Sequence, residues 1–428
     1  MVKSATLLCP IIYLNHVTNL LSSIGAHAYI AEVVEPEFSL NMIMVIRLLI
    51  WNITEFQKHP FTIYKKSRTH FPCLYALEVI TDDGYVLRMH RFPEGRINYP
   101  GRRNKPPVYL QHGILVDAAN WFTVSHADQA LPLILVEAGF DVWLGNTRGT
   151  RYSRKHVSEN ISSSDDYWDF TVSEMGKYDL PAFIDFVNQH TGQKVHFIGH
   201  SLGTTQFFAA FSEWKVEEKV KTATLLSPIA FLNHIRAHFV VISAKAYIGE
   251  IAGTFGIPFV DLKVQPLSAI TYAFCNVPGI NCWEVFSKFS GPNCCMNAST
   301  VNLYLHNWPE AASIKTLTHL SQNIRTGIFS KYDYGNPATN REHYGVPEAP
   351  VYDIQTSIPK DFPLLFCHGG LDALADPKDV QRTLSILRSH RNIHEIYVDN
   401  YAHYDFINAM TAKDVLYPDV VNFIKAHD

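Results

Sequence analysis

The sequence predicts an α/β protein with a mostly parallel central sheet, helices on both faces, and an inserted cap. Two observations indicate this fold class. First, short buried strands alternate with helical segments on both sides of residues 231–359, and such alternation is typical of a parallel sheet covered on both faces. Second, the chain has 428 residues, of which 47% are apolar and 18% are charged. This is a globular composition with room for a large core.

The first predicted elements are two strands joined by a tight turn. The segments Leu74–Ile80 and Tyr85–Phe92 are strand-like, and the Asp83-Gly84 pair between them is typical of a hairpin. Two buried strands follow, at Pro107–Gln111 and Phe140–Leu144. Each is a short apolar run of the kind that crosses the middle of a sheet.

Helices and strands then alternate up to residue 230 and again from residue 360. The expected elements are a helix at Glu174–Asn188, a strand at Lys194–Ile198, a helix at Thr204–Trp214, strands at Thr222–Ser227 and Phe362–Cys367, a helix at Asp376–Arg388, a strand at His394–Val398 and a helix at Asp414–Lys425. We therefore assign residues 41–230 and 360–428 to the two parts of the core. Residues 231–359, which hold clustered cysteines and many aromatic residues, are interpreted as a cap or lid insertion.

Residues 1–40 do not fit this scheme. Residues 4–33 nearly repeat residues 222–251. Because the second copy opens with an expected internal strand, the first has no place in the same sheet, and a solenoid would need several stacked copies. We interpret residues 1–40 as a stray fragment of a paralogous chain, joined by gene fusion or by gene prediction. A short signal peptide over residues 3–14 is the alternative.

The stretch Gly199-His200-Ser201-Leu202-Gly203 is the clearest functional signal, because it lies between an expected strand and an expected helix. In this G-x-S-x-G pattern the serine occupies a sharp turn, which exposes its hydroxyl over the end of the sheet. The five residues alone also fit an ordinary glycine turn, but the strand before them and the helix after them favour a nucleophile. We predict that Ser201 is a catalytic nucleophile.

A serine hydroxyl needs a base, usually a histidine that a carboxylate orients. In folds with this turn the acid and then the histidine follow on loops after later strands. Asp372 follows the strand at Phe362–Cys367 and has no other evident role, whereas the competing Asp376 precedes Pro377 as a helix N-cap. His403 follows the last strand. We predict Asp372 as the acid and His403 as the base.

Two backbone N–H groups are expected to stabilise the oxyanion that forms in acyl transfer. One belongs to the residue after the nucleophile, Leu202, and the other to the loop after the third strand. That loop begins His112-Gly113-Ile114, so the N–H of Ile114 is the expected second donor. A plain turn at His112-Gly113 is the alternative interpretation. This chemistry requires no metal and no organic cofactor.

Charge and cysteine spacing argue against several classes of protein. The net charge is −4 without a basic stripe, which disfavours nucleic acid as a partner. No apolar run reaches the ~18 residues of a transmembrane helix, and no C-x-x-C pair suggests zinc. Four of the seven cysteines fall within residues 275–295, which indicates a local disulfide and an oxidising compartment. Candidate glycosylation sequons occur at Asn52, Asn160 and Asn297.

From about Phe71 to the C-terminus, the sequence resembles the acid lipase family, which includes gastric and lysosomal acid lipases. The resemblance rests on six motifs in order: Val79-x-Thr81-x-Asp83-Gly84-Tyr85, Leu110-Gln111-His112-Gly113 with Asn120-Trp121, Asp141-Val142-Trp143-Leu144-Gly145-Asn146-x-Arg148-Gly149, Glu174-Met175-x-Lys177-Tyr178-Asp179-Leu180-Pro181, Gly199-His200-Ser201-x-Gly203-Thr204-Thr205 and Leu374-Ala375-Asp376-Pro377-x-Asp379-Val380. It implies an α/β-hydrolase fold with a cap and a lid. It also implies the same roles for Ser201, Asp372, His403, Ile114 and Leu202.

The same resemblance implies a lipase that hydrolyses esters of neutral lipids, triacylglycerol or sterol esters, at a lipid–water interface. A secreted or lysosomal location and a Cys275–Cys282 disulfide are implied with it. Leu202 stands where close mammalian relatives have glutamine, but only its backbone N–H is needed. The alternatives are a general carboxylesterase or thioesterase, and a catalytically inactive lipid-binding relative. The long insertion argues against the first, and the complete set of predicted catalytic residues argues against the second.

Overall fold

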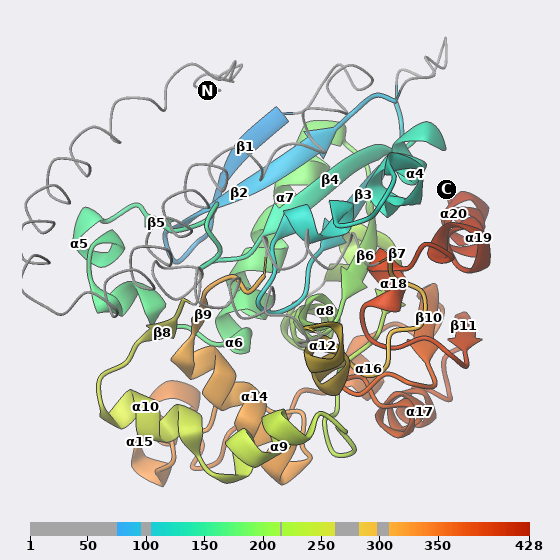
Figure 1. Cartoon of the computed structure of the whole chain (residues 1–428). Coiled ribbons are helices and arrows are strands. Elements are labelled where there is room, and N and C mark those ends of the chain that lie inside the picture. The colour runs from blue at the N-terminus through green and yellow to red at the C-terminus, as the bar shows by residue number, and fades with distance from the viewer. Residues whose placement is uncertain (1–74, 96–103, 215, 262–281, 298–307) are drawn as a thin grey trace, which may run out of the picture. The chain divides into compact units, whose positions relative to one another are not determined.

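The structure is a computed structural model that describes residues 75–95, 104–214, 216–261, 282–297 and 308–428 (Figure 1). The predictions for residues 1–40, for Asn52 and for Cys275 lie outside these residues.

A nine-stranded sheet forms the centre of the described part of the chain, with strand order β1-β2-β4-β3-β6-β7-β10-β11 and β5 beside β2. The strands are β1 (Tyr75–Ile80), β2 (Tyr85–Phe92), β3 (Pro107–Gln111), β4 (Asp141–Asn146), β5 (Lys155–His156), β6 (Val195–His200), β7 (Val220–Leu226), β10 (Leu364–Gly369) and β11 (Ile393–Val398). Strand β2 pairs antiparallel with β1, β4 and β5. All neighbours from β4 to β11 are parallel. The predicted fold class is therefore confirmed.

Burial along the sheet follows from the position of each strand. Strands β3, β4, β6 and β10 are buried along their whole length, as expected for central parallel strands covered on both faces. Among the described strands, β11 pairs only with β10, and it is partly exposed. Because parallel strands point the same way, the loops after β3, β6, β10 and β11 leave the sheet at the same edge.

The helices that cover the sheet include α4 (Leu131–Glu137) and α20 (Tyr417–Ala426), which pack against each other, and α7 (Leu180–Thr191) and α8 (Leu202–Glu213), which form a second packed pair (Figure 1). The other helical segments before residue 230 are η2 (Ala118–Phe122), η3 (Ala127–Gln129), α5 (Glu159–Ser162), η4 (Asp165–Trp168), α6 (Val172–Glu174), η5 (Met175–Asp179) and η6 (Val216–Glu218). After residue 360 they are α17 (Pro377–Ile386), α18 (Asp405–Asn408) and α19 (Ala412–Val415).

Two predicted helices are interrupted. The helix expected at Glu174–Asn188 passes through one π-helical turn, Met175–Asp179, before α7 begins. The helix expected at Asp414–Lys425 divides into α19 and α20. Both α7 and α20 carry a proline in their first turn, Pro181 and Pro418. Proline has no backbone N–H, so it cannot continue the hydrogen-bond ladder of a preceding α-helix.

Within residues 231–359, the described elements are mostly helical. They are α9 (His238–Lys245), α10 (Ile248–Thr254), α12 (Cys282–Ser290), α14 (Ile314–Thr326), α15 (Pro337–Tyr344), α16 (Ile354–Ser357) and the two-stranded sheet of β8 (Phe259–Val260) and β9 (Ala312–Ser313). Helices α9 and α10 pack on α14 (Figure 1). Among all helices of the described ranges, none has the length and apolar character needed to cross a membrane.

A buried arginine connects the β1–β2 hairpin to the rest of the described core. Arg148, which follows β4, forms ion pairs with Asp83 of the hairpin turn at 2.7 Å and with Asp179 at 2.6 Å. Its guanidinium carbon lies 3.8 Å from the centre of the Tyr85 ring. Arg148 and Asp179 are both fully buried. Removing one partner of such a pair leaves a buried charge without compensation.

We expect Arg148→Met to lower the free energy of unfolding by about 3–5 kcal/mol, measured by urea denaturation. The matched control is Arg391→Met. Arg391 pairs with Asp361 at 2.6 Å, but both side chains are largely exposed, and exposed pairs contribute less than about 1 kcal/mol. Equal losses in the two variants would contradict the structural role of Arg148.

Candidate active site

Ser201 occupies a strained turn between β6 and α8. Its backbone has φ 55° and ψ −121°, a region that residues other than glycine rarely adopt. The turn is possible because its neighbours lack side chains. A Cβ atom on Gly203 would stand 2.6 Å from the carbonyl oxygen of Gln111, so the chain packs closely there. The turn has the strand-to-helix context that the G-x-S-x-G pattern predicts.

Asp372 and His403 lie in direct contact, although they come from loops after different strands. Nδ1 of His403 is 3.0 Å from each carboxylate oxygen of Asp372, and both side chains are buried. Oδ1 of Asp372 also accepts the N–H groups of Leu374 and Ala375, at 2.9 and 2.8 Å. Burial alone would raise the pKa of Asp372. The adjacent His403 and the two N–H groups outweigh burial and lower the pKa of Asp372 below its usual range.

The competing carboxylate, Asp376, has a different role in the structure. Its side chain accepts the N–H of Lys378 at 2.9 Å as the N-cap of α17, with Pro377 at the first helical position. Its other oxygen pairs with Nε of Arg236 at 2.8 Å. The predicted capping role of Asp376 is therefore confirmed.

His200 connects the strand that carries Ser201 to the loop that carries His403. Nε2 of His200 donates to the carbonyl oxygen of His403 at 3.0 Å, and the two ring centres are 4.9 Å apart. Burial lowers the pKa of His200 to about 3, so its ring is neutral near neutral pH. Ser227 Oγ donates to the same carbonyl at 3.2 Å. His403 is thus fixed beside the turn that carries Ser201.

The two predicted oxyanion donors line one pocket. Ile114 and Leu202 both belong to its wall, which is continued by apolar side chains such as Phe170 and Met175. Leu202 is the first residue of α8, where backbone N–H groups have no partner within the helix. The site for a Cβ on Gly113 lies 3.0 Å from Cβ of Ser201. The loop after β3 therefore passes directly over the serine.

His112 holds that loop in place. Its Nδ1 donates to the carbonyl oxygen of Gly113 at 2.8 Å, and its Nε2 accepts the N–H of Thr147 at 3.1 Å. Burial lowers the pKa of His112, which favours this neutral form. The ring thereby links the loop after β3 to the loop after β4. Leu115, two residues after Gly113, has a positive φ of 59°.

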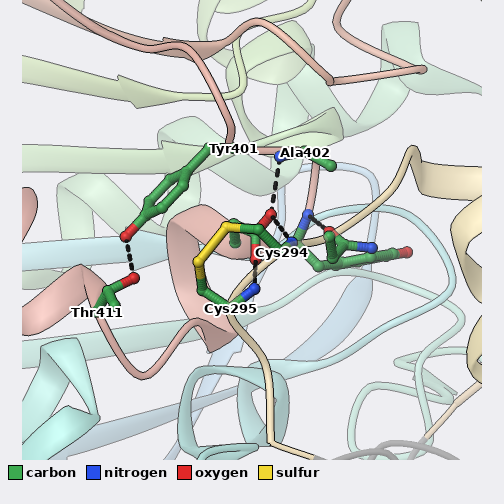
Figure 2. The surroundings of a disulfide bond; sticks show 8 residues. Cys294, Cys295, Tyr401, Ala402 and Thr411 are labelled. Atoms are coloured by element: carbon green, nitrogen blue, oxygen red, sulfur yellow. Dashed lines mark hydrogen bonds between the residues drawn. A yellow bond between two sulfur atoms is a disulfide. The ribbon is translucent and has the colours of Figure 1, made fainter.

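Two of the described cysteines form a disulfide between sequence neighbours, a pairing that the sequence did not indicate, while the buried Cys367 is free. Cys294 is bonded to Cys295 (Figure 2). Both sulfurs lie close to the carboxylate of Asp405, and these three residues are a possible metal-binding group among the described residues. Metal binding requires thiolates, which the disulfide consumes, so the group does not fit a metal in this oxidised form. The Cys275–Cys282 pairing lies outside the described side chains and stays a prediction.

Two predicted glycosylation sites are described. Asn160 is exposed in the short helix α5, and Asn297 is partly buried after the disulfide. Their glycosylation stays a prediction. No local sequence pattern indicates the contacts that Ser290–Cys295 and Asp405 make around His403. Asp405 lies two residues after His403, but the segment that it binds is more than 100 residues earlier in the chain.

Two protein families match the chain. The model of a partial alpha/beta-hydrolase lipase region matches residues 74–125, and the model of the alpha/beta hydrolase fold matches residues 106–409. Among solved structures, a thermostable carboxyl esterase from Bacillus coagulans superimposes with a TM-score of 0.52 at 14% identity, over 83% of this chain and 99% of that one. This likeness concerns the fold alone.

Several lipases are similar to the chain over most of their length. Triacylglycerol lipase 2 of Arabidopsis thaliana is 44% identical over 354 residues, which is 81% of this chain and 84% of that protein. Gastric triacylglycerol lipase of Homo sapiens is 35% identical, with 81% and 86% covered. Lysosomal acid lipase/cholesteryl ester hydrolase of Macaca fascicularis is 35% identical, with 82% and 87% covered.

Proposed function

Because the chain belongs to the acid lipase family of the α/β-hydrolase superfamily, we propose that it is a serine-dependent lipase that hydrolyses esters of neutral lipids. The similar proteins are named as triacylglycerol lipases and as a cholesteryl ester hydrolase, which supports triacylglycerol or sterol esters as the substrate class. The observation that carries the mechanism is the contact of His403 Nδ1 with both oxygens of Asp372.

That contact determines which nitrogen of the histidine can accept a proton. A carboxylate can only accept hydrogen bonds, so Nδ1 of His403 carries the hydrogen and Nε2 is left as the base. Ser201 attacks the ester carbonyl while Nε2 takes the hydroxyl proton, and Asp372 stabilises the imidazolium that forms. The proton then passes to the leaving alcohol, which gives an acyl-enzyme. Water, deprotonated by the same nitrogen, releases the fatty acid and restores Ser201.

The N–H groups of Ile114 and Leu202 stabilise the tetrahedral intermediate in this mechanism. The pocket that they share and the position of Leu202 at a helix N-terminus support this role. A helix N-terminus carries a partial positive charge, which stabilises an oxyanion. Backbone groups supply both hydrogen bonds, so the leucine side chain at position 202 is compatible with activity.

An exposed apolar surface on α9 and α10 supports action at a lipid–water interface. We define this apolar surface by five large side chains: Phe239, Ile242, Ile248, Ile251 and Phe255. Phe239 is 75% exposed and Phe255 is 80% exposed. Soluble proteins rarely expose such clusters unless the surface contacts another apolar phase. We propose that residues 231–359 act as a cap, and that its apolar surface inserts into the lipid.

We expect Phe239→Ser and Phe255→Ser each to reduce hydrolysis of emulsified long-chain triacylglycerol about 10-fold, because burial of a phenylalanine in lipid contributes about 1.5–3 kcal/mol. Hydrolysis of a soluble short-chain ester should not change. The control is Val157→Ser, which removes a 59% exposed apolar side chain outside residues 231–359. Equal losses on both substrates would contradict interfacial binding through this surface.

The proposed function is tested by measuring hydrolysis of long-chain and short-chain glycerol esters from pH 4 to pH 8 with the full chain. Activity on long-chain esters supports a lipase. Activity on short soluble esters alone would replace this proposal with a general carboxylesterase or thioesterase. A folded protein that binds lipid without hydrolysis would be an inactive relative.

We also propose that the protein follows the secretory route, to the cell exterior or to a lysosome. Two similar proteins are named as gastric and lysosomal lipases. The Cys294–Cys295 disulfide and the exposed sequon at Asn160 fit an oxidising compartment.

A further inference from the structure

We propose that the segment Ser290–Cys295 positions the acid–base pair, and that Asn293 and Asp405 are the positioning side chains that fasten it. This inference rests on the proposed function, because it assigns the pair its role. The segment begins at the last residue of α12, within residues 231–359. In this proposal, the positions of the Asp372 and His403 loops depend on a segment that lies outside the two core parts, residues 41–230 and 360–428.

One carbonyl group of this segment joins the two catalytic loops. The oxygen of Ser290 accepts the N–H of His403 and the N–H of Ala373, each at 3.2 Å. Ala373 directly follows Asp372, and the two loops leave different strands. A shared acceptor therefore fixes the separation of the acid and the base. Ser290 is itself buried, and its Oγ accepts from Nδ2 of Asn293 at 2.6 Å.

Gly291 brings the segment against the acid loop. Its φ is +96°, and a Cβ atom there would stand 2.1 Å from the carbonyl oxygen of Leu371 and 3.1 Å from Cβ of Ala402. Only glycine permits both this backbone conformation and this close approach. The segment thus touches the residue before Asp372 and the residue before His403.

Asn293 and Asp405 hold the chain on both sides of His403. Oδ1 of Asn293 accepts the N–H of Tyr404 at 3.0 Å. Oδ2 of the buried Asp405 accepts the N–H of Ala402 at 2.8 Å, a contact that Figure 2 shows at the labelled Ala402. Every residue from Ala402 to Tyr404 therefore has its N–H bound by this group of contacts.

The carboxylate of Asp405 also binds the disulfide. Oδ2 accepts the N–H of Cys294 at 3.1 Å, and Oδ1 accepts the N–H of Cys295 at 3.2 Å. The disulfide bond between the two cysteines restricts the backbone that presents these N–H groups. The carbonyl oxygen of Cys295 in turn accepts the N–H of Met410 at 2.8 Å. One carboxylate thereby joins the loop of the base to a covalently restrained turn.

The test compares Asp405→Ala and Asp405→Asn with the full-length wild type on a soluble short-chain ester. We expect Asp405→Ala to lower kcat about 100-fold, since a displacement near 1 Å of a catalytic group costs about that factor, and to leave KM within twofold. Asp405→Asn keeps one acceptor oxygen and should retain more activity. The control is Asp353→Ala. Asp353 accepts two backbone N–H groups at the exposed start of α16. The kcat of Asp353→Ala should equal that of the wild type. Wild-type kcat in Asp405→Ala would overturn the proposal.

Amide hydrogen exchange tests the same contacts without any catalysis. Exchange at Ala402, Cys294 and Cys295 should accelerate in Asp405→Ala and stay at the wild-type rate in Asp353→Ala; unchanged exchange at all three would overturn the proposal. If the wild type hydrolyses no ester while exchange accelerates as expected, the contacts stand and the lipase assignment fails.

If Asp405→Ala does not fold, Asn293→Ala and Asn293→Asp replace it. The aspartate keeps the acceptor for the Tyr404 N–H, so it should retain a higher kcat than alanine, and equal kcat values would contradict the role of Asn293.

Discussion

Replacement of Ser201 by alanine is expected to lower kcat for ester hydrolysis by about 10⁵–10⁶-fold. In the proposed mechanism the hydroxyl forms the acyl-enzyme, so its removal leaves only substrate binding and oxyanion stabilisation. Alanine is smaller than serine and its Cβ is already accommodated at φ 55°. The fold should therefore persist, which urea denaturation will check. The measurement is hydrolysis of a soluble short-chain ester by purified wild type and variant.

A fluorophosphonate probe gives a second measurement of the same residue. It should label the wild type once and fail to label Ser201→Ala. The matched control is Ser212→Ala, in the helix α8 that follows Ser201. The hydroxyl of Ser212 donates to the carbonyl oxygen of Phe208 at 2.9 Å. That variant should keep both activity and labelling. Persistent labelling of Ser201→Ala would assign the nucleophile to another residue.

Replacement of Asp372 by asparagine is expected to lower kcat by about 10⁴-fold. The amide nitrogen of asparagine is a donor, so it stabilises the histidine tautomer that carries its hydrogen on Nε2. In that tautomer His403 cannot accept the proton of Ser201. KM should change little, because Asp372 is buried beneath the histidine and contacts it directly. The steady-state parameters on a soluble ester provide the measurement.

The control for this prediction is Asp376→Asn, four residues later in the same loop. Asparagine is as good an N-cap as aspartate, so α17 should remain capped, and only the ion pair with the half-exposed Arg236 is lost. Its kcat should stay within twofold of the wild type. If Asp376→Asn loses activity and Asp372→Asn does not, the acid has been assigned to the wrong residue.

Replacement of Asp372 by asparagine is also expected to change how the free energy of unfolding depends on pH. The pKa of Asp372 is lower in the folded protein than its ordinary value near 3.9. Its carboxylate therefore contributes stability that is present above that ordinary pKa and is lost as pH falls through the folded pKa. In urea denaturation at a series of acidic pH values, the wild type should lose stability as pH falls. This loss should be smaller in Asp372→Asn and should persist in Asp376→Asn.

The sequence by itself determined the elements whose signals are local. Alternation of apolar runs predicted β3, β4, β6 and β10 to within one or two residues, because a strand buried on both faces must be apolar along its length. The Asp83-Gly84 pair predicted the hairpin between β1 and β2. The pattern around Ser201 predicted a strand-to-helix turn, which the structure has. Chain order then identified Asp372 and His403 as partners, and the structure brings them into contact.

Tertiary structure alone decided the contacts between distant segments. Nothing in the local pattern relates Ser290–Cys295 to His403, because hydrogen bonds across more than 100 residues depend on the path of the whole chain. Two other features also depend on tertiary structure. One is the π-helical turn at Met175–Asp179, and the other is the burial of Arg148 between Asp83 and Asp179. Periodicity reports which face of an element is buried. It does not report which backbone groups form hydrogen bonds when elements far apart in sequence pack against one another, and in this chain such hydrogen bonds surround the loops of Asp372 and His403.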